Sequence, residues 1–361
     1  MEQKGRLGAR YSAASCADCK GALPTKVGAP MVKYLVKVGT DAKGTPMPQA
    51  GSVLQAQTTK GMTPEGSVTI ASWETVDGTY GDGTAFTLQK PVYKFTGIAP
   101  KFFSVRLAIQ KPFGMGLIEA IDENEIAALA AKSQTGGRMS LVTDPETGQL
   151  RMGRYGYKAT QATLKQQISK RLNDAFSITT TIYPKPDRGS AQPEFGDASN
   201  KLADADVENI YRYYSLRAVP PRQNFRDKEV QKGEALFASA GCTGCHVPTL
   251  KTSAYHPMVE LRNQTIHPYT DMLLHDMGEG LADNMGDGNT SGAEWHTAAL
   301  WGEGRIGPSY KGTEVYLHDG RARNLPEAIL WHGGQAYRAK DNFRNMSAEN
   351  RAAVVKFLKS L

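Results

Sequence analysis

Five consecutive residues, Cys242-Thr-Gly-Cys245-His246, carry the clearest chemical signal in the chain. Two thiols three positions apart on a tight turn can add to the two vinyl groups of a haem, and the next residue then presents its imidazole to the iron. The alternative is half of a zinc site, which would need Cys16 and Cys19 from the far end of the chain, a spacing unlike the usual zinc modules. The motif therefore favours a covalent c-type haem.

The same thiol spacing recurs at Cys16-Ala-Asp-Cys19-Lys20, where a lysine replaces the imidazole. No histidine precedes His246, so a second haem would need another ligand in this half. The Lys20 amine could serve, because iron competes with the proton for it. Alternatives are a thiol–disulfide couple, a weakly coordinated iron or a methionine ligand. The methionines considered are Met31, Met47, Met62 and Met115.

A third group of residues runs from His318 to His332, and its second part, 325–332, has a helical pattern. Helical spacing would place His332 on one apolar face with Leu325, Ala328 and Ile329, so its ring could point into the pocket that a haem needs. A histidine in such a place is more often a polar residue with an ordinary partner. The pattern alone leaves both interpretations open.

The elements that must position these residues are mostly predicted as helices. Capping residues and apolar periodicity predict helices over 126–132, 160–173, 205–216, 227–241 and 347–358. Short alternating stretches between 67 and 95, separated by glycine-rich turns, predict small peripheral hairpins. A segment rich in proline and glycine, 184–199, and Pro220-Pro221 predict two domains, 1–222 and 223–361.

Composition narrows the class of protein. The 361 residues are 40% hydrophobic, and the net charge of +7 (43 basic minus 36 acidic residues) is spread along the chain. Nucleic-acid binding gains little support, whereas an acidic redox partner would suit this charge. No apolar run approaches the roughly 18 residues of a membrane-spanning helix. The start lacks the apolar segment of a signal peptide, so we expect a chain that is either cytoplasmic or trimmed.

With these motifs, the chain resembles the bacterial di-haem oxidoreductases, relatives of the di-haem cytochrome c peroxidases and of the di-haem enzyme that matures methylamine dehydrogenase. The likeness extends over most of the chain. The segments that carry it are 114–121, 152–158, 233–237, 242–250, 266–280, 317–323 and 327–334.

The resemblance implies a mainly α fold of two cytochrome-c-like haem domains with long loops and small peripheral β-hairpins. Carried over from the peroxidase relatives, the C-terminal haem would be attached at Cys242 and Cys245. Its iron ligands would be His246 and His332, with Met277 and His275 as rivals of His332, and His318 would pack near the haem edge. Two imidazole ligands should lower the potential, so this haem is expected to relay electrons.

In those relatives the N-terminal haem is the active site, where hydrogen peroxide binds an open face of the iron and a carboxylate moves the proton. Glu119 is the expected carboxylate and Gln110 its companion. Most relatives have a histidine where this chain has Lys20. A lysine-ligated catalytic haem is known in pentahaem nitrite reductases, so reduction of another small oxygen-bearing molecule stays open. Some relatives also hold a calcium ion between the domains.

These expectations combine into a peroxidase-like oxidoreductase with two covalent haems, which takes electrons from a cytochrome or a cupredoxin. Covalent haem attachment happens outside the bacterial cytoplasm, which predicts a periplasmic location for a trimmed chain. Two alternatives stay open. One is a di-haem electron carrier without enzymatic activity, and the other is a mono-haem protein whose Cys16 and Cys19 form a thiol–disulfide couple.

Overall fold

The computed structural model describes most of the chain, and the helices and strands below belong to that part. The described residues are 7–13, 27–29, 31, 33–59, 62–108, 111–192, 200–306 and 314–361. Four predicted site residues, Cys16, Cys19, Lys20 and Gln110, lie outside them. The structure is 29% helical and 23% strand, so the prediction of a mainly α fold is wrong.

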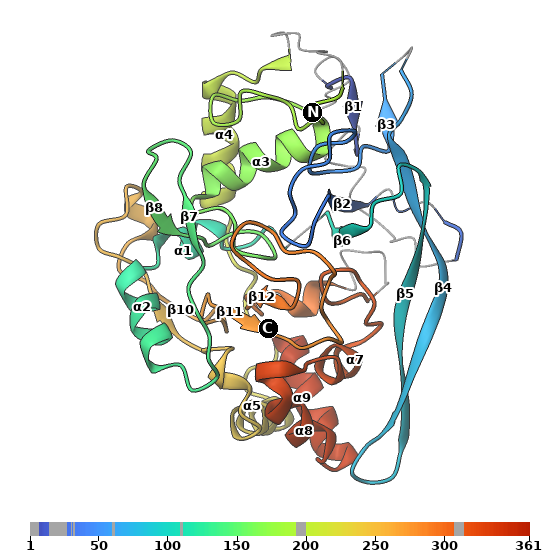
Figure 1. Ribbon diagram of the computed structural model, residues 1–361. Helices are drawn as coiled ribbons and strands as arrows, with labels where there is room; N and C mark the ends of the chain where they lie inside the picture. The colour runs from blue at the N-terminus through green and yellow to red at the C-terminus, as the bar shows by residue number, and fades with distance from the viewer. Residues whose placement is uncertain are drawn as a thin grey trace.

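The α-helices are α1 (Met115–Ala120), α2 (Glu123–Lys132), α3 (Leu164–Phe176), α4 (Asp204–Ser215), α5 (Lys228–Ser239), α7 (Leu325–Leu330), α8 (Tyr337–Arg344) and α9 (Ala348–Ser360). In Figure 1, α3 and α4 lie near the top of the molecule, α5 and α7–α9 lie near its bottom, and α1 and α2 lie on the left-hand side between them. Short 3-10 turns are η2 (Cys242–Gly244), η3 (Val259–Leu261), η4 (Glu303–Arg305) and η5 (Gly334–Ala336).

Side-chain caps begin several of these helices, as the sequence predicts. Asp122 accepts a hydrogen bond from the Asn124 amide ahead of α2, and Asp227 does the same for the first amides of α5. Thr163 and Gln166 form a reciprocal capping box at the start of α3. The five predicted helical segments are therefore confirmed, with ends that shift by a few residues.

The strands pair in twos, and each pair is antiparallel. The pairs are β1 (Arg10–Tyr11) with β3 (Gln57–Thr58), β2 (Tyr34–Gly39) with β6 (Phe102–Leu107), β4 (Gly66–Thr79) with β5 (Ala85–Gly97), β7 (Leu141–Thr143) with β8 (Leu150–Met152), β9 (Leu250–Lys251) with β10 (Thr265–Ile266), and β11 (Leu274–Asp276) with β12 (Glu294–His296). Most are too short to show an alternating pattern in the sequence.

The β4–β5 pair is one long ribbon along an edge of the molecule (Figure 1). Near its base Val68 and Ile70 are buried, and at its tip the Gly81 amide donates to the Arg344 carbonyl of α8. The small peripheral hairpins that the sequence predicts are thus a single structure that reaches the C-terminal helices. This ribbon accounts for much of the strand content that the predicted fold class missed.

Three apolar cores hold the elements together. The first takes Ile118, Leu164 and Phe176 from the N-terminal side and Leu250 and Ile266 from residues after 222. The second lies among α5, α7, α8 and α9, and the third lies between the β2–β6 pair and the base of the ribbon. Because the first core draws on both sides of position 222, the two predicted domains share apolar packing.

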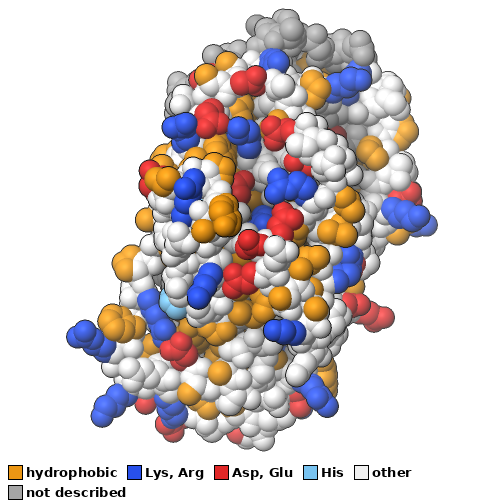
Figure 2. Space-filling view, turned by 90° about the vertical axis from the view of Figure 1, so that its left-hand side faces the viewer, with side chains coloured by type: hydrophobic (Ala, Val, Ile, Leu, Met, Phe, Trp, Pro, Cys, Tyr) orange, Lys and Arg blue, Asp and Glu red, His pale blue; other side chains and the backbone are white. Residues whose placement is uncertain are grey.

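No helix in the described part of the chain combines the length and the apolar character needed to cross a membrane. The face drawn in Figure 2 carries basic and acidic side chains that are intermingled, without a block of one sign. The net charge of +7 is therefore not concentrated on this face.

Candidate functional site

The C-x-x-C-H segment forms a tight turn directly after α5. Gly241 has a φ of +89°, a left-handed conformation that glycine adopts readily, and this residue ends the helix ahead of η2. The His246 amide then donates to the Cys242 carbonyl at 2.9 Å. Cys242 and Cys245 are free, half-buried thiols. Burial raises the pKa of Cys242 to about 12, whereas a thiol–disulfide couple requires a lowered thiol pKa.

His246 and His332 share one hydrogen-bonding arrangement. The Nδ1 atom of His246 lies 2.9 Å from the carbonyl oxygen of Tyr269, and that of His332 lies 2.7 Å from the carbonyl oxygen of Ala328. Since a carbonyl can only accept, each Nδ1 carries the proton. In a neutral ring this leaves a lone pair on Nε2, the atom that ligates a metal.

Both imidazoles are neutral at pH 7. Burial lowers the pKa of His246 to about 4, and His332 adds a smaller lowering, which places the two rings within electrostatic reach. Burial also lowers the pKa of His332. Around them the second core supplies apolar walls, including Phe237, whose ring centre lies 6.1 Å from that of His246. Two free thiols and two neutral imidazoles in apolar surroundings are a donor set that fits a covalently attached haem.

His275, one of the rival ligands, uses both of its ring nitrogens elsewhere. Its Nε2 lies 2.8 Å from Asp271 Oδ2, and its Nδ1 lies 2.9 Å from Gln335 Oε1. Burial disfavours the charged ring, but the hydrogen bonds with Asp271 and Cys245 outweigh burial and raise the pKa of His275 to about 10. Met277, the other rival, packs against the second core.

Cys245, Asp271 and His275 form the cluster of metal-ligand types found among the described residues. A single ion would need all three to face one point. Instead the Cys245 sulfur lies 3.7 Å from Nδ1 of His275, while Asp271 lies against Nε2 on the other side of the ring. This geometry does not favour one shared metal ion, and the presence of Cys245 in the C-x-x-C-H motif explains the cluster better.

His318 stacks against the ring of Trp295 in β12. Its ring is 3.9 Å from that of Trp295 with an interplanar angle of 15°, and its Nε2 lies 3.3 Å from Asp283 Oδ1. Its carbonyl accepts the Leu107 amide of β6. Trp295 belongs to the second core, so His318 connects β6 with that core. That His318 packs near the edge of a haem stays a prediction.

Glu119 ties three helices together. Its Oε1 accepts the Leu164 amide at the start of α3 at 2.8 Å, and its Oε2 accepts the Tyr211 hydroxyl of α4 at 2.8 Å. His256 Nε2 lies 3.8 Å from Oε2. Burial raises the pKa of Glu119, but these three partners outweigh it and lower the pKa. The carboxylate is therefore ionised, and its role as a proton carrier stays a prediction.

Lys158 is an unusual residue that the sequence analysis did not single out. Its side chain is fully buried, and its Nζ donates to three carbonyls, those of Ser291, Gly292 and Glu294. The same atom lies 3.5 Å from the centre of the Trp295 ring. Lys158 is the last residue of segment 152–158, one of the segments that carry the family resemblance. That resemblance was the sequence signal that included Lys158. The three hydrogen bonds of its Nζ connect residues 291–294 with the loop before α3.

Comparison with protein families decides the relationship. A family model described as "Di-haem oxidoreductase, putative peroxidase" matches residues 51–361. The chain belongs to the di-haem oxidoreductase family. The match covers Glu119, Cys242, His246 and His332, whereas Cys16, Cys19 and Lys20 precede it. None of the curated proteins or solved structures compared with this di-haem oxidoreductase matches it. Membership indicates haem cofactors and a general redox role.

Proposed function

We propose that this di-haem oxidoreductase is a periplasmic, peroxidase-like enzyme with two covalent c-type haems. The observation that carries the proposal is the matched pair His246 and His332, each with Nδ1 fixed by a backbone carbonyl. Bound haem would supply an iron that exchanges electrons with a protein donor and with a small oxidant.

In this proposal Cys242 and Cys245 would attach the C-terminal haem through thioether bonds, and His246 and His332 would hold its iron through Nε2. The carbonyls of Tyr269 and Ala328 keep each ring in the required tautomer. Held by two imidazoles, the haem would have a low potential and would supply electron transfer. These residues therefore suit electron relay.

The catalytic haem is assigned to Cys16, Cys19 and Lys20. Support comes from the thiol spacing and from a family description that names two haems. Hydrogen peroxide is the proposed substrate. Glu119, with Gln110 as companion, is the proposed proton carrier, because the ionised carboxylate can accept a proton at either oxygen. The match to the family description supports the reaction class, and the reduction of another small oxygen-bearing molecule is tested below.

The proposed electron donor is a cytochrome or cupredoxin with an acidic face, which the net charge of +7 would attract. The periplasmic location follows from the proposed covalent attachment. A calcium ion between the domains is retained as a prediction that dialysis against a chelator, followed by metal analysis, would test.

The deciding experiment is haem stoichiometry. The protein is produced with a cytochrome c maturation system that includes a lyase for lysine motifs, and its denatured mass and pyridine haemochrome spectrum are measured. Two covalent haems are expected, and Cys242→Ala/Cys245→Ala should retain only the N-terminal one. A single haem in the wild type would favour the thiol–disulfide alternative for Cys16 and Cys19. A haem-free protein containing zinc would overturn the proposal.

Peroxide turnover separates an enzyme from an electron carrier. With reduced cytochrome as donor, the di-haem protein should consume peroxide and bind carbon monoxide at one iron. If it binds neither carbon monoxide nor cyanide and consumes no peroxide, it is a carrier. Activity with nitrite or hydroxylamine instead of peroxide would change the substrate class and leave the haem assignment unaltered.

A further inference from the structure

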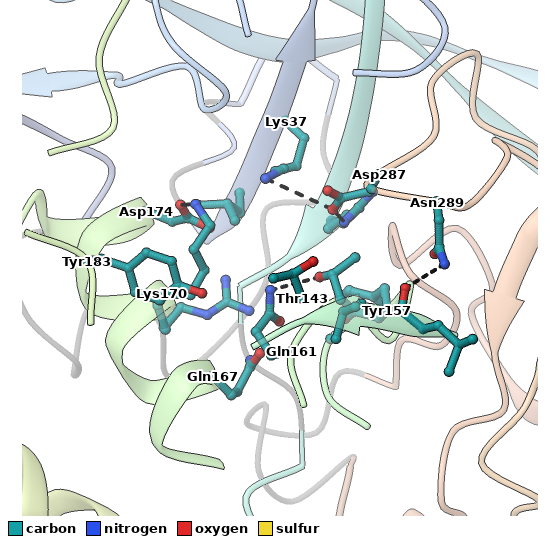
Figure 3. A pocket seen from close by; sticks show the side chains of 18 residues that line it. Lys37, Thr143, Tyr157, Gln161, Gln167, Lys170, Asp174, Tyr183, Asp287 and Asn289 are labelled. Atoms are coloured by element: carbon teal, nitrogen blue, oxygen red, sulfur yellow. Dashed lines mark hydrogen bonds and ion pairs between the residues drawn. The ribbon is translucent and has the colours of Figure 1, made fainter. Parts of the chain in front are cut away.

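A polar cavity of about 410 Å³ lies apart from the residues discussed above (Figure 3). It is bounded by α3, the β2–β6 pair, β7 and the loops at 156–161 and 287–289. None of the predicted haem residues in the described part of the chain lines it. The proposed relay and proton-transfer roles therefore leave the cavity unexplained.

Four basic side chains line the cavity. They are Lys37, Arg106, Lys170 and Arg171. Among the described residues of the lining, the acidic side chains are Asp174 and Asp287, which gives this described part a formal net charge of +2 (four minus two). In a partly enclosed, low-dielectric space this imbalance attracts an anion.

The two acids are already neutralised by direct partners. Asp287 Oδ2 lies 2.7 Å from Arg106 Nη1 and 4.0 Å from Lys37 Nζ, and Asp174 accepts from Lys170 Nζ. The side chains of Lys37 and Asp287, both labelled in Figure 3, point toward each other in the lining of the cavity. A further acid near the wall, Asp187, hydrogen-bonds to Ser52 and interacts with Lys170. Even with Asp187, basic groups outnumber acidic groups four to three.

Within the described part of the chain, the guanidinium groups of Arg106 and Arg171 in the lining each have an N–H donor without an acceptor. Arg106 is 6% exposed, and its Nε donates to Ser104 Oγ and its Nη1 to Asp287, while its buried Nη2 has no partner among the residues that the structure describes. The buried Nη1 of Arg171 also has none. A buried guanidinium donor without an acceptor is strongly disfavoured, so the two arginines that line the cavity favour an acceptor group near them.

We propose that this cavity binds the carboxylate of a small organic anion. The planar, two-oxygen carboxylate matches the fork of N–H donors on a guanidinium, and Arg106 and Arg171 each offer one unused donor. Leu35, Leu141 and Val142 line the same cavity and provide apolar contacts for the carbon skeleton. Its volume falls within the range of about 300–1,000 Å³ that is usual for small-ligand sites.

The carboxylate could come from two sources. One is a free dicarboxylate taken from solution, and the other is the carboxylate side chains that a haem carries. The second source rests on the proposed function, whereas the first does not. The experiment below therefore has a separate arm for each source, and the haem content of the same preparation is measured independently.

Succinate is the probe for the first arm, with uncharged succinamide as its matched control. Isothermal titration of the complete, haem-loaded protein should show binding of succinate and none of succinamide. The half-buried Arg171 can be changed without breaking an acidic pair, so Arg171→Gln should weaken succinate binding at least 10-fold. Arg106→Gln should act in the same direction, and Arg226→Gln, at an exposed position, should bind as the wild type does.

The second arm uses resonance Raman bands of the haem carboxylate side chains. If a haem carboxylate fills the cavity, succinate does not bind, and Arg171→Gln shifts these bands while Arg226→Gln does not. Binding of succinate that is equal in Arg171→Gln and the wild type would overturn the proposal. So would the absence of both succinate binding and a Raman shift. If the protein contains no haem but still binds succinate, the proposed function is refuted and the proposal for the cavity stands.

Discussion

The guanidinium of Arg351 in α9 lies 3.8 Å from the centre of the Tyr80 ring at the tip of the β4–β5 ribbon. Its Nη2 also donates to Asp82 at 2.7 Å. The two partners are about 270 positions away in the sequence, yet Arg351 is 8% exposed and its head group is enclosed by them. This contact fastens the ribbon to the last helix.

Replacing Tyr80 with leucine should therefore weaken the fastening of the ribbon. The loss of the cation–π contact should lower the free energy of unfolding by about 1–2 kcal/mol. Denaturant unfolding with fluorescence detection measures the change. Tyr337→Leu, at an exposed ring that lies 4.8 Å from Lys340, is the control and should change little. Equal stability of Tyr80→Leu and the wild type would contradict the contact.

Exchanging His332 for methionine tests the proposed relay ligand. A thioether in place of one imidazole should raise the midpoint potential of the C-terminal haem and bring a new absorption band near the red end of the spectrum. Spectroelectrochemical titration gives the potential. Met277→Leu serves as control and should leave it unchanged. If Met277→Leu moves the potential and His332→Met does not, the ligand assignment passes to Met277.

The buried pair of Asp271 and His275 predicts a pH dependence of stability. The folded-state pKa of His275 is raised to about 10 from 6.5. The raised value means that the stabilisation is fully present below pH 6.5 and is lost as the pH rises towards 10. The free energy of unfolding should fall by about 1–3 kcal/mol across that interval. In Asp271→Asn the slope should flatten; an unchanged slope would show that another group titrates.

Glu119→Gln separates the proton-carrier role from the packing role. The amide oxygen can still accept the Leu164 amide, and the amide nitrogen can donate to Tyr211, so the fold should lose only about 1 kcal/mol. Peroxide turnover should fall by about 10²–10⁴-fold if the carboxylate carries the proton. Tyr211→Phe removes the hydrogen bond between α4 and Glu119 but keeps the carboxylate, and its turnover should fall far less. If Glu119→Gln and Tyr211→Phe lose peroxide turnover to the same extent, Glu119 has a positioning role.

Local chemistry made part of this protein predictable. Asp122 and Asp227 mark the starts of helices, and the spacing of Cys242 and Cys245 predicts the tight turn that they form, because each signal is complete within a few residues. Two-residue strands carry no period to detect, and the outer half of the ribbon buries too little to show a clear alternation. For this reason helices dominated the predicted fold class.

The polar sites depend on contacts between distant parts of the chain. Arg106 meets Asp287 across 181 positions, and Glu119 meets Tyr211 across 92. Neither pairing follows from periodicity, because each partner sits on an element whose neighbour is chosen by tertiary packing. The cavity and the arginine donors beside it could thus be found only in three dimensions, and the same holds for the three carbonyl contacts of Lys158.

The first apolar core is built from residues that are synthesised early and residues that are synthesised late. Leu164 and Phe176 are made early, but their partners Leu250 and Ile266, and finally Trp301, emerge from the ribosome much later. The N-terminal half must therefore keep part of its apolar surface uncovered until more than four-fifths of the chain has been made. A chain cut near position 222 would leave that surface permanently exposed, so we expect such a fragment to aggregate rather than fold.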